Sequence, residues 1–493
     1  MWRKLPVWAN LAFGLSLANL LFLQAWGQMF GLGYFQQNSH QPFNSAALLL
    51  NVAFLTAFFT FARSWLGRCD RGAWSVVAAV LLILLLLIPL NWVRFRFHWH
   101  YPFVAELVRS PLAWILISLL LVALIMWRRP VLDGLGIAII VLFPLALYHC
   151  SRALWITVES RPPPSQPVEA FAPRTPPKSP RVIWILFDEM DQRVVFSERP
   201  ASVHLPEIDR FRQISWHAEN AVSPAGNTLL SMPSLIIGKV VVDAQPVGPG
   251  DLILTITNCA ARVNWRTQPN IFRDAREMKL NTAVSGWYHP YSRILAGDLT
   301  FCSWYAFPPY DGCGASNVLS SLEEQVASWS PLRWRQRHLE VTARIVADTK
   351  KFATATETGL FLGHVPIPHY PGIYDPETHQ ASIATFDVAK SYLNNLALVD
   401  RTLGELRQAM EGAGTWESST VVVTSDHWWR QANQLDGKTD HRVPLLIKLA
   451  RQTNAVTYWK PLNTVVLRDL MRNILQQKIS TPGEISQWFD RNN

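Results

Sequence analysis

The fold of this chain is decided by one stretch, Val182-Ile-Trp-Ile-Leu-Phe-Asp-Glu189. A second stretch has the same form, Thr420-Val-Val-Val-Thr-Ser-Asp-His427. Short apolar runs rich in β-branched residues are typical of buried strands in a largely parallel sheet. Ligands of open α/β sheets gather beyond the carboxyl ends of such strands. The polar residues that end both stretches therefore predict a metal site at one edge of the sheet.

Strand-like and helix-like segments alternate through the rest of residues 181–493, which predicts an α/β fold. A helix is expected at about 387–410, because its apolar residues recur at helical spacing. The other expected elements are helices at 205–213 and 463–477 and strands at 281–285, 359–365 and 443–448.

The first 150 residues are of a different kind. They hold five long apolar stretches, each close to the roughly 20 residues with which a helix crosses the hydrocarbon core of a membrane. The stretches are residues 8–27, 45–62, 74–93, 111–128 and 131–149. We therefore expect a transmembrane domain with five helices at 1–150, a Pro-rich linker at 151–180 and an external domain at 181–493.

The formal net charge of +9 is unevenly distributed along the chain. Residues 1–150 carry +7, residues 151–180 carry +2, and residues 181–493 carry no net charge. The positive charges thus belong to the flanks of the apolar stretches, and the charge balance argues against nucleic acid as a partner.

The same charges predict the orientation of the helices. Arg3 and Lys4, the turn at 63–71 and the pair at 128–129 are basic, whereas residues 28–44 hold no Lys or Arg. Because cytoplasmic loops are enriched in positive charge, we expect the N-terminus inside, although Arg94, Arg96 and Arg109 would then lie outside. Five crossings then put the chain after residue 150 on the external or periplasmic side.

The five cysteines give little information. Cys302 and Cys313 are candidates for a disulfide in an oxidising compartment, but their spacing does not decide the matter. No cysteine pair has the spacing of a metal site.

A candidate nucleophile lies between the two strand ends, in Ser223-Pro-Ala-Gly-Asn-Thr-Leu-Leu-Ser-Met-Pro-Ser-Leu-Ile-Ile-Gly238. A Gly-containing turn leads to Thr228, where an apolar stretch of helical character begins. Thr228 is either an ordinary N-cap of that helix or a reactive group. Helix N-termini favour phosphate or sulfate oxygens, and a metal would lower the pKa of the threonine hydroxyl and orient it.

Four segments occur in the order seen in the alkaline phosphatase and sulfatase superfamily. They are Phe187-Asp-Glu-Met-Asp191, Thr228-Leu-Leu-Ser-Met-Pro-Ser234, Pro368-His-Tyr-Pro-Gly-Ile-Tyr-Asp375 and Ser425-Asp-His427. The Thr-x-x-Ser-x-Pro spacing resembles that of the lipid A phosphoethanolamine transferases. Five spans before an external domain are similar to these enzymes and to the lipoteichoic acid synthases. The resemblance covers residues 181–450 and, more loosely, the first 150.

This resemblance implies a central, mostly parallel, alkaline-phosphatase-like sheet flanked by helices, in a multi-pass protein of the bacterial inner membrane. It makes Asp188, Asp426 and His427 ligands of a divalent metal, and Thr228 a ligand and the nucleophile together. Glu189 either reaches a second metal or bonds locally. Oxygen donors with one imidazole suit zinc or manganese better than magnesium.

The resemblance also implies residues that contact the substrate. His369 matches a histidine near the substrate phosphate or the leaving group, and Lys438 resembles a lysine that contacts the anion. His289 and Arg293 suit binding of a phosphate or head group. For each of them an exposed or structural role stays open, and the remaining histidines at 364 and 441 have no assigned role.

One departure from the family pattern bears on the reaction. Sulfatases that convert their nucleophile to formylglycine need Cys or Ser followed by x-Pro-x-Arg, whereas Ser231-Met-Pro-Ser is followed by Leu235. This favours an unmodified Thr228, although Ser231, otherwise expected to bind substrate, is the alternative nucleophile if the alignment shifts by three residues.

The sequence therefore favours transfer of a phospho-head-group from a phospholipid donor to an envelope lipid or glycan. A sulfatase-like hydrolase or phosphodiesterase, with water as acceptor, is the alternative enzyme. An inactive metal-binding scaffold is the alternative outside the enzymes.

Overall fold

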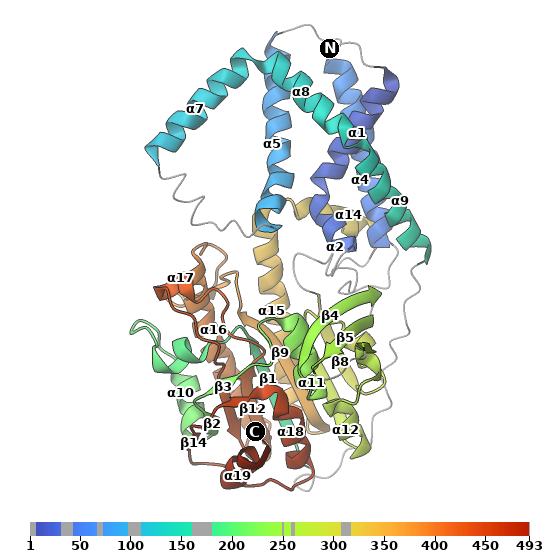
Figure 1. The fold of residues 1–493 in the computed structure, drawn as a ribbon. Coiled ribbons are helices and arrows are strands. Elements are labelled where there is room, and N and C mark those ends of the chain that lie inside the picture. The colour runs from blue at the N-terminus through green and yellow to red at the C-terminus, as the bar shows by residue number, and fades with distance from the viewer. Residues whose placement is uncertain are drawn as a thin grey trace. The chain divides into compact units, whose positions relative to one another are not determined.

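The computed structural model describes residues 6–30, 43–66, 72–96, 110–159, 180–248, 251–257, 262–306 and 317–492. Its contacts divide the chain into two compact units. We call them the helical unit, which holds the described residues up to 159 together with 317–333, and the sheet unit, which holds the others (Figure 1).

Apolar helices, several of them interrupted, form the helical unit. A single residue, Phe22, separates α1 from α2, and α9 follows α8 after one residue. The helices are α1 (Val7–Leu21), α2 (Leu23–Phe30), α4 (Phe43–Leu66), α5 (Gly72–Arg96), α7 (Pro111–Met126), α8 (Arg128–Val141), α9 (Phe143–Glu159) and α14 (Val318–Ala327).

Two of the described helices are long and apolar enough to cross a membrane, through Asn44–Trp65 of α4 and Val76–Val93 of α5. The pair Pro130–Val141 and Phe143–Val158 adds a third if it counts as one span, although it bends by 40°. The prediction of five spanning helices is therefore not confirmed. The reason is physical, since apolar composition sets the environment of a helix but not the residue at which it ends.

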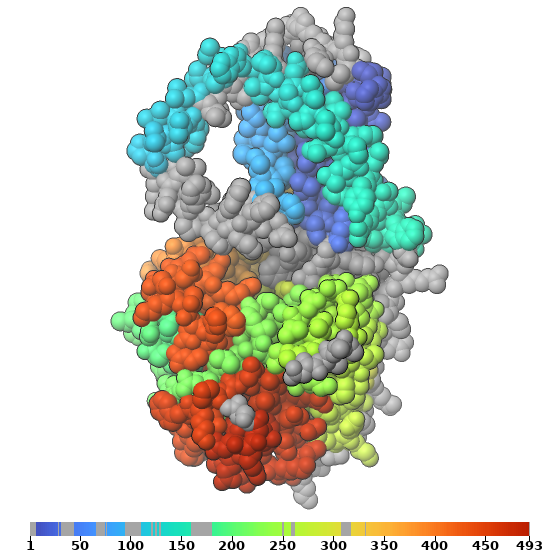
Figure 2. All heavy atoms as spheres, viewed as in Figure 1, coloured from blue at the N-terminus to red at the C-terminus, as the bar shows by residue number. Residues whose placement is uncertain are grey.

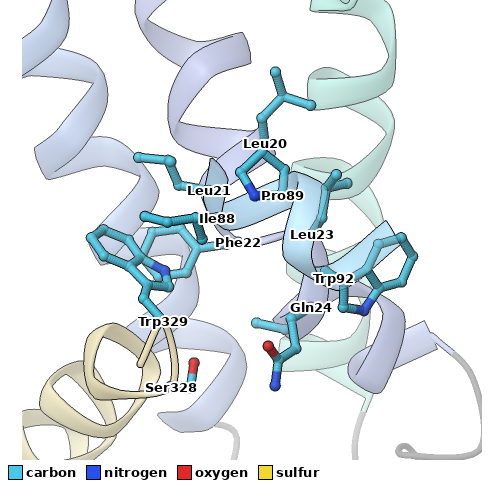
Figure 3. A pocket seen from close by; sticks show the side chains of 11 residues that line it. Leu20, Leu21, Phe22, Leu23, Gln24, Ile88, Pro89, Trp92, Ser328 and Trp329 are labelled. Atoms are coloured by element: carbon cyan, nitrogen blue, oxygen red, sulfur yellow. The ribbon is translucent and has the colours of Figure 1, made fainter. Parts of the chain in front are cut away.

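Close backbone approach and polar contacts hold the helical unit together. A Cβ on Gly14 of α1 would lie 2.4 Å from Thr60 Oγ1 of α4, so only glycine fits there. Asn51 of α4 donates Nδ2–H to the carbonyl oxygen of Leu322 in α14 at 3.2 Å. A small pocket in this unit is lined by residues that include Phe22 at the helix break, Pro89 and Trp329 (Figure 3).

The sheet unit is built on a mostly parallel sheet, which has eight strands in the described chain. The strand order is β14-β2-β13-β12-β1-β9-β7-β8, and only the pairs formed by β13 are antiparallel. The strands are β1 (Val182–Asp188), β2 (Trp216–Ala218), β7 (Asn281–Trp287), β8 (Phe301–Tyr305), β9 (Thr358–Pro368), β12 (Thr420–Ser425), β13 (Leu445–Lys448) and β14 (Val456–Tyr458).

Helices cover both faces of this sheet. On one face, α10 (Pro206–Gln213), α15 (Pro331–Thr354) and α16 (Val388–Gly412) share a buried apolar core with alternate residues of β1. The opposite side carries α11 (Thr228–Ile237), α12 (Ile271–Glu277) and α18 (Leu467–Leu475), which contact one another or the strands. The predicted α/β class and its flanking helices are confirmed, because β1 is buried along its whole length.

Some features of the sheet unit were not expected from the sequence. A separate antiparallel sheet joins β4 (Val241–Gly248), β5 (Asp251–Ile256) and β6 (Arg262–Asn264). Figure 2 shows this sheet (yellow-green) on the same face of the unit as the C-terminal segments (red). The last helix, α19 (Pro482–Asn492), was also missed.

Two expectations, the linker at 151–180 and the disulfide between Cys302 and Cys313, fall partly outside the described residues. Helix α9 continues to Glu159, so the first nine residues of the predicted linker 151–180 are helical, because they extend an apolar helix rather than begin the proline-rich segment. The rest of the linker up to 179 and Cys313 lie outside the described residues.

Candidate active site

Three neighbouring structural elements bring most of the predicted ligands to one edge of the large sheet. Asp188 ends β1, Asp426 and His427 follow β12, and Thr228 is the first residue of α11. Strands β12 and β9 both pair in parallel with β1, so their carboxyl ends share one edge. His364 of β9 lies at the same edge, and all five side chains are buried.

The Thr228 hydroxyl lies among the predicted ligands. Its Oγ1 is 2.8 Å from Asp426 Oδ2, 3.4 Å from His427 Nε2 and 3.5 Å from Asp188 Oδ2. The shortest of these contacts gives the hydroxyl proton a carboxylate acceptor. The arrangement is therefore suited to deprotonating Thr228.

Asn227, rather than Thr228, caps α11. Asn227 Oδ1 accepts the N–H of Leu230 at 3.1 Å, and its extended backbone turns the chain into the helix. The N-cap role considered for Thr228 is therefore wrong, and its hydroxyl is free for another role. Ser231, the alternative nucleophile, is fully buried one turn later and donates its hydroxyl to the carbonyl oxygen of Ala225 at 2.8 Å.

A group of three buried side chains has the geometry of a metal site. Asp188, His364 and Asp426 each offer one ligand atom, and these atoms lie within 4.8 Å of one another. Asp188 Oδ1 and His364 Nε2 have no hydrogen-bond partner among the described residues. Burial, followed by the charges of Asp426 and Glu189, raises the pKa of Asp188 well above its ordinary value. A divalent cation would relieve both the repulsion and the missing contacts.

His427 is oriented as a metal ligand would be. Its Nδ1–H donates to the carbonyl oxygen of Trp428 at 2.9 Å, which leaves the lone pair on Nε2. That nitrogen lies 3.5 Å from both Asp188 Oδ1 and Asp426 Oδ2. A lone pair that faces two carboxylates is unfavourable unless a cation lies between them, so the donor set fits a divalent metal.

The sequence analysis missed His364. Its Nε2 lies 3.8 Å from Asp188 Oδ2 and 4.0 Å from Asp426 Oδ2, and its Nδ1 is 3.2 Å from the Tyr291 hydroxyl. Burial lowers the pKa of His364 to about 4, so the ring is neutral at pH 7. One signal pointed to it, since it is the only ionisable residue in the predicted strand 359–365.

Glu189 is held differently from the other acidic residues. Its Oε1 accepts the Nε–H of Arg430 at 2.7 Å, and it is not part of the three-residue group. Burial alone would raise the pKa of Glu189, but Arg430, His369 and His427 lower it to about 2. The structure thus places Glu189 in an ion pair, and its role as a metal ligand stays a prediction.

His369 and His289 lie near the centre in different ways. His369 is half-buried, its Nδ1 is 2.5 Å from the carbonyl oxygen of Tyr370, and its ring meets Trp287 edge-on. Burial lowers its pKa, which the charge of Glu189 partly offsets. His289 is fully buried and donates Nε2–H to the backbone carbonyl oxygen of Thr228 at 3.0 Å, so it contacts the backbone of the candidate nucleophile.

Two other predicted substrate residues, Arg293 and Lys438, are seen in other contacts. The Arg293 guanidinium is buried and lies over the ring of Trp304. Lys438 is 60 % exposed and donates its Nζ–H to Glu198 Oε2 at 2.7 Å. Their roles in binding substrate stay predictions.

Several solved structures are similar to part of this chain. Ps i-CgsB in complex with a neocarrahexaose shares 14 % identity at a TM-score of 0.45, covering 61 % of this chain and 73 % of that one. The phosphonate monoester hydrolase of Agrobacterium radiobacter shares 15 % identity at 0.39, covering 60 % and 74 %. An alkaline phosphatase superfamily protein from Vibrio parahaemolyticus shares 13 % at 0.39, covering 63 % and 72 %. The comparison with curated proteins gives no match.

One comparison covers more than half of the chain. The sulfatase family model matches residues 180–477, a range that contains every residue of the candidate site. Members of this superfamily use a divalent metal, and the buried Asp188, His364 and Asp426 fit one. The chain therefore belongs to the sulfatase family and is an enzyme of the alkaline phosphatase and sulfatase superfamily.

Proposed function

We propose that this protein is a membrane-bound, metal-dependent transferase of phospho-head-groups, with Thr228 as the nucleophile. The observation that carries the proposal is the position of Thr228 Oγ1, 2.8 Å from Asp426 Oδ2 and within 3.5 Å of Asp188 and His427. The donor is a phospholipid, and the acceptor is a hydroxyl of an envelope lipid or glycan.

The buried acidic and imidazole groups would hold the metal, with zinc or manganese as the ions that best suit oxygen donors and a neutral imidazole. When bound, the metal lowers the pKa of the threonine hydroxyl and neutralises charge on the phosphoryl oxygens. Asp188, Asp426, His427 and the newly identified His364 form this set in the proposal. Glu189 would add to it only if it left Arg430.

In the first step of the proposed reaction, Thr228 gives its proton to Asp426 and its oxygen bonds to the phosphorus of the donor head group. The bond from phosphorus to the diacylglycerol oxygen breaks, and His369 is the candidate that protonates this oxygen. An acceptor hydroxyl then gives its proton to His369 and its oxygen bonds to the phosphorus of the phosphothreonine, while the threonine oxygen leaves and takes back the proton held by Asp426. The N-terminus of α11 favours the negative charge of the transferred group throughout.

The membrane setting is part of the same proposal. The two or three described helices that are apolar enough to span support membrane association. We place five crossings in the chain, with the N-terminus inside and the sheet unit on the periplasmic side. Reporter fusions after residues 40, 70, 105 and 130 would test this topology, because each successive site must change sides.

A direct test uses the purified full-length protein with phosphatidylethanolamine or phosphatidylglycerol as donor. Mass spectrometry of the intact protein is expected to show a head-group adduct on Thr228, together with free diacylglycerol. The adduct should vanish in Thr228→Ala and persist in Ser231→Ala, the matched control one turn away. Adduct-free Thr228 with undiminished turnover would contradict the proposal.

The family match supports a second candidate, a hydrolase that uses water as acceptor. The same incubation separates the two, since a hydrolase releases the head group into water and leaves the added acceptor unmodified. Arylsulfate turnover that is lost in Ser231→Ala and kept in Thr228→Ala would favour a sulfatase that uses Ser231. An inactive scaffold predicts that Thr228→Ala changes no activity at all.

A further inference from the structure

We propose that Arg430 forms a binding subsite for a sulfate-type or phosphate-type oxyanion at the candidate active site. The inference rests on the proposed function in one respect, that the substrate carries a tetrahedral oxyanion. It goes beyond it by assigning the residue that recognises this group. Arg430 lies four residues after Asp426 and had no role in the sequence analysis.

Three contacts fix the segment that carries Arg430. The ring of Trp429 stacks on that of Tyr392, with centroids 3.8 Å apart and planes within 6°. The Tyr392 hydroxyl in turn donates to the backbone carbonyl oxygen of Glu189 at 3.0 Å. The ring of Trp428 stacks on that of His441 at 4.2 Å. Arg430 is thus placed by rigid aromatic side chains on both preceding residues.

Trp428 also ties this segment to the loop that leads to Thr228. A Cβ on Gly226 would lie 2.6 Å from the Trp428 ring, so the indole packs directly on the Gly226 backbone. The segment that carries Arg430 and the loop that carries the candidate nucleophile are therefore in contact. A shift of one would displace the other.

The guanidinium has donors left for a ligand. Its Nε–H donates to Glu189 Oε1 at 2.7 Å, and no hydrogen bond of its two terminal nitrogens is seen to the residues that the structure describes. The Arg430 side chain is 47 % exposed, whereas Glu189 is only 4 % exposed. A guanidinium held at one nitrogen and open at the other two suits the bidentate geometry of a phosphate or sulfate.

The charges around Arg430 favour the same role. Its pKa is raised by the charge of Glu189 first, and also by those of Asp188 and Asp426, so its positive charge acts on the metal-site carboxylates. Glu189 neutralises that charge from the buried side only. An oxyanion approaching from solvent meets the exposed side of a fixed cation whose charge also acts on Asp188 and Asp426.

The test compares binding of inorganic phosphate and orthovanadate to variants of the full-length, metal-loaded protein by calorimetry. We expect Arg430→Met to weaken binding about 10- to 100-fold, as loss of a charge-assisted bidentate contact should. Arg430→Lys keeps the positive charge but not the planar guanidinium with its paired N–H donors. Its affinity for phosphate should lie between those of Arg430→Met and the wild type. Equal affinity in wild type and Arg430→Met would overturn the proposal.

Removing Arg430 leaves Glu189 buried and unpaired, so a second comparison controls for that damage. Glu189→Gln keeps a side-chain oxygen that can accept the Nε–H of Arg430, so it is the reference for the double variant, with the metal content of each measured by elemental mass spectrometry. Glu189→Gln with Arg430→Met has no orphaned charge and should still bind phosphate weakly. Recovery of wild-type affinity in this double variant would show that Arg430 acts only on Glu189, and would overturn the subsite.

The two proposals fail in different ways. Binding of phosphate that depends on Arg430, without any head-group transfer by the wild type, would defeat the proposed function and leave the subsite standing. Head-group transfer by the wild type, together with equal phosphate affinity in the wild type and in Arg430→Met, would defeat the subsite and leave the proposed function standing.

Discussion

The edge of the large sheet and the helical unit differ in what determines the position of a side chain. At the sheet edge, Asp188 and Asp426 stand at the ends of paired strands, and the register of those strands fixes their separation. In the helical unit, α1 ends at Leu21 although Phe22 and Leu23 continue its apolar character. The end of a predicted strand therefore indicates where a functional side chain lies, whereas apolar composition indicates only the environment of a helix.

The difference also appears in how polar groups are satisfied. The sheet edge concentrates unpaired buried groups, such as Asp188 Oδ1 and His364 Nε2, around one point. The helical unit also holds buried polar atoms without a partner among the described residues, such as Ser16 Oγ and Asn19 Nδ2. Other polar contacts between its helices are paired, and Asn51 donates Nδ2–H to Gln325 Oε1 at 2.9 Å. Buried groups that lack partners and converge point to a missing ligand, and paired ones point to packing.

The largest expected effect comes from the carboxylate that contacts the most partners. Asp426→Asn removes one charge of the metal group and weakens the acceptor of the Thr228 proton. We expect metal affinity to fall by at least about 100-fold and activity to disappear. Metal content after dialysis and turnover with donor lipid measure the two effects, and a variant that keeps full metal content would contradict the assignment.

A smaller loss is expected at the residue that the sequence analysis overlooked. His364→Gln keeps a polar side chain but removes the imidazole Nε2 that lies 3.8 Å from Asp188 Oδ2. Metal affinity should fall about 10- to 100-fold, whether His364 is a ligand or supports one. Zinc titration with the matched variant His441→Gln, whose ring stacks on Trp428 outside the metal group, provides the control.

Much of the sheet edge was predictable, because strands leave a local signal. The stretch 182–187 is apolar and β-branched, and the residues after it must lie at the strand's end. His364 lies in a predicted strand, but no local signal places that strand beside β1, and Arg430 had no local signal at all. His364 meets Asp188 only because β9 lies next to β1, and Arg430 meets Glu189 across more than two hundred residues. Which strands are neighbours is a tertiary fact that one sequence does not give.

The errors of prediction in the helical unit have a different cause. Pro89, a residue that often ends helices, lies inside α5, whereas α1 ends at Leu21 without proline or glycine. The residue types that usually end helices therefore do not mark the helix ends in this unit. The N-cap at Asn227 was also missed, because Asn227 and Thr228 are both good caps and the sequence cannot choose between them.

The pH dependence of stability tests burial in the sheet unit away from the candidate active site. Burial raises the pKa of Asp400 from 3.8 to about 6, although its Oδ1 accepts the N–H of Ile208 at 2.8 Å. Its folded-state pKa lies above the unfolded value, so its ionisation costs stability as pH rises from about 4 to 6 and the cost persists at pH 7. The ceiling of this cost is about 3 kcal/mol.

Asp400→Asn keeps the oxygen that accepts from Ile208 and cannot ionise. We expect it to be more stable than the wild type at pH 7 and no more stable at pH 4, as measured by chemical denaturation at each pH. An equal difference at both values would show that the carboxyl is not the group that titrates.

In the helical unit, a comparable test concerns packing alone. Gly14→Ala places a Cβ 2.4 Å from Thr60 Oγ1 and 2.7 Å from the Thr56 carbonyl oxygen, so α1 and α4 must separate. We expect a loss of about 1–3 kcal/mol in the free energy of unfolding in detergent. Gly134→Ala is the matched control, since its Cβ would meet nothing within 4 Å. Equal stability of the two variants would remove the evidence for close contact between α1 and α4.

The smallest expected effect concerns Lys438, for which the family resemblance and the structure indicate different roles. The resemblance makes Lys438 a contact of the substrate anion, yet its exposed ammonium is held by Glu198 at 2.7 Å. Because an exposed ion pair between flexible side chains is screened by water and salt, Lys438→Ala should leave the melting temperature unchanged. We expect KM for the donor to change by less than about twofold, far less than in Arg430→Met. A tenfold rise in KM with kcat unchanged would show that Lys438 contributes to binding of the donor.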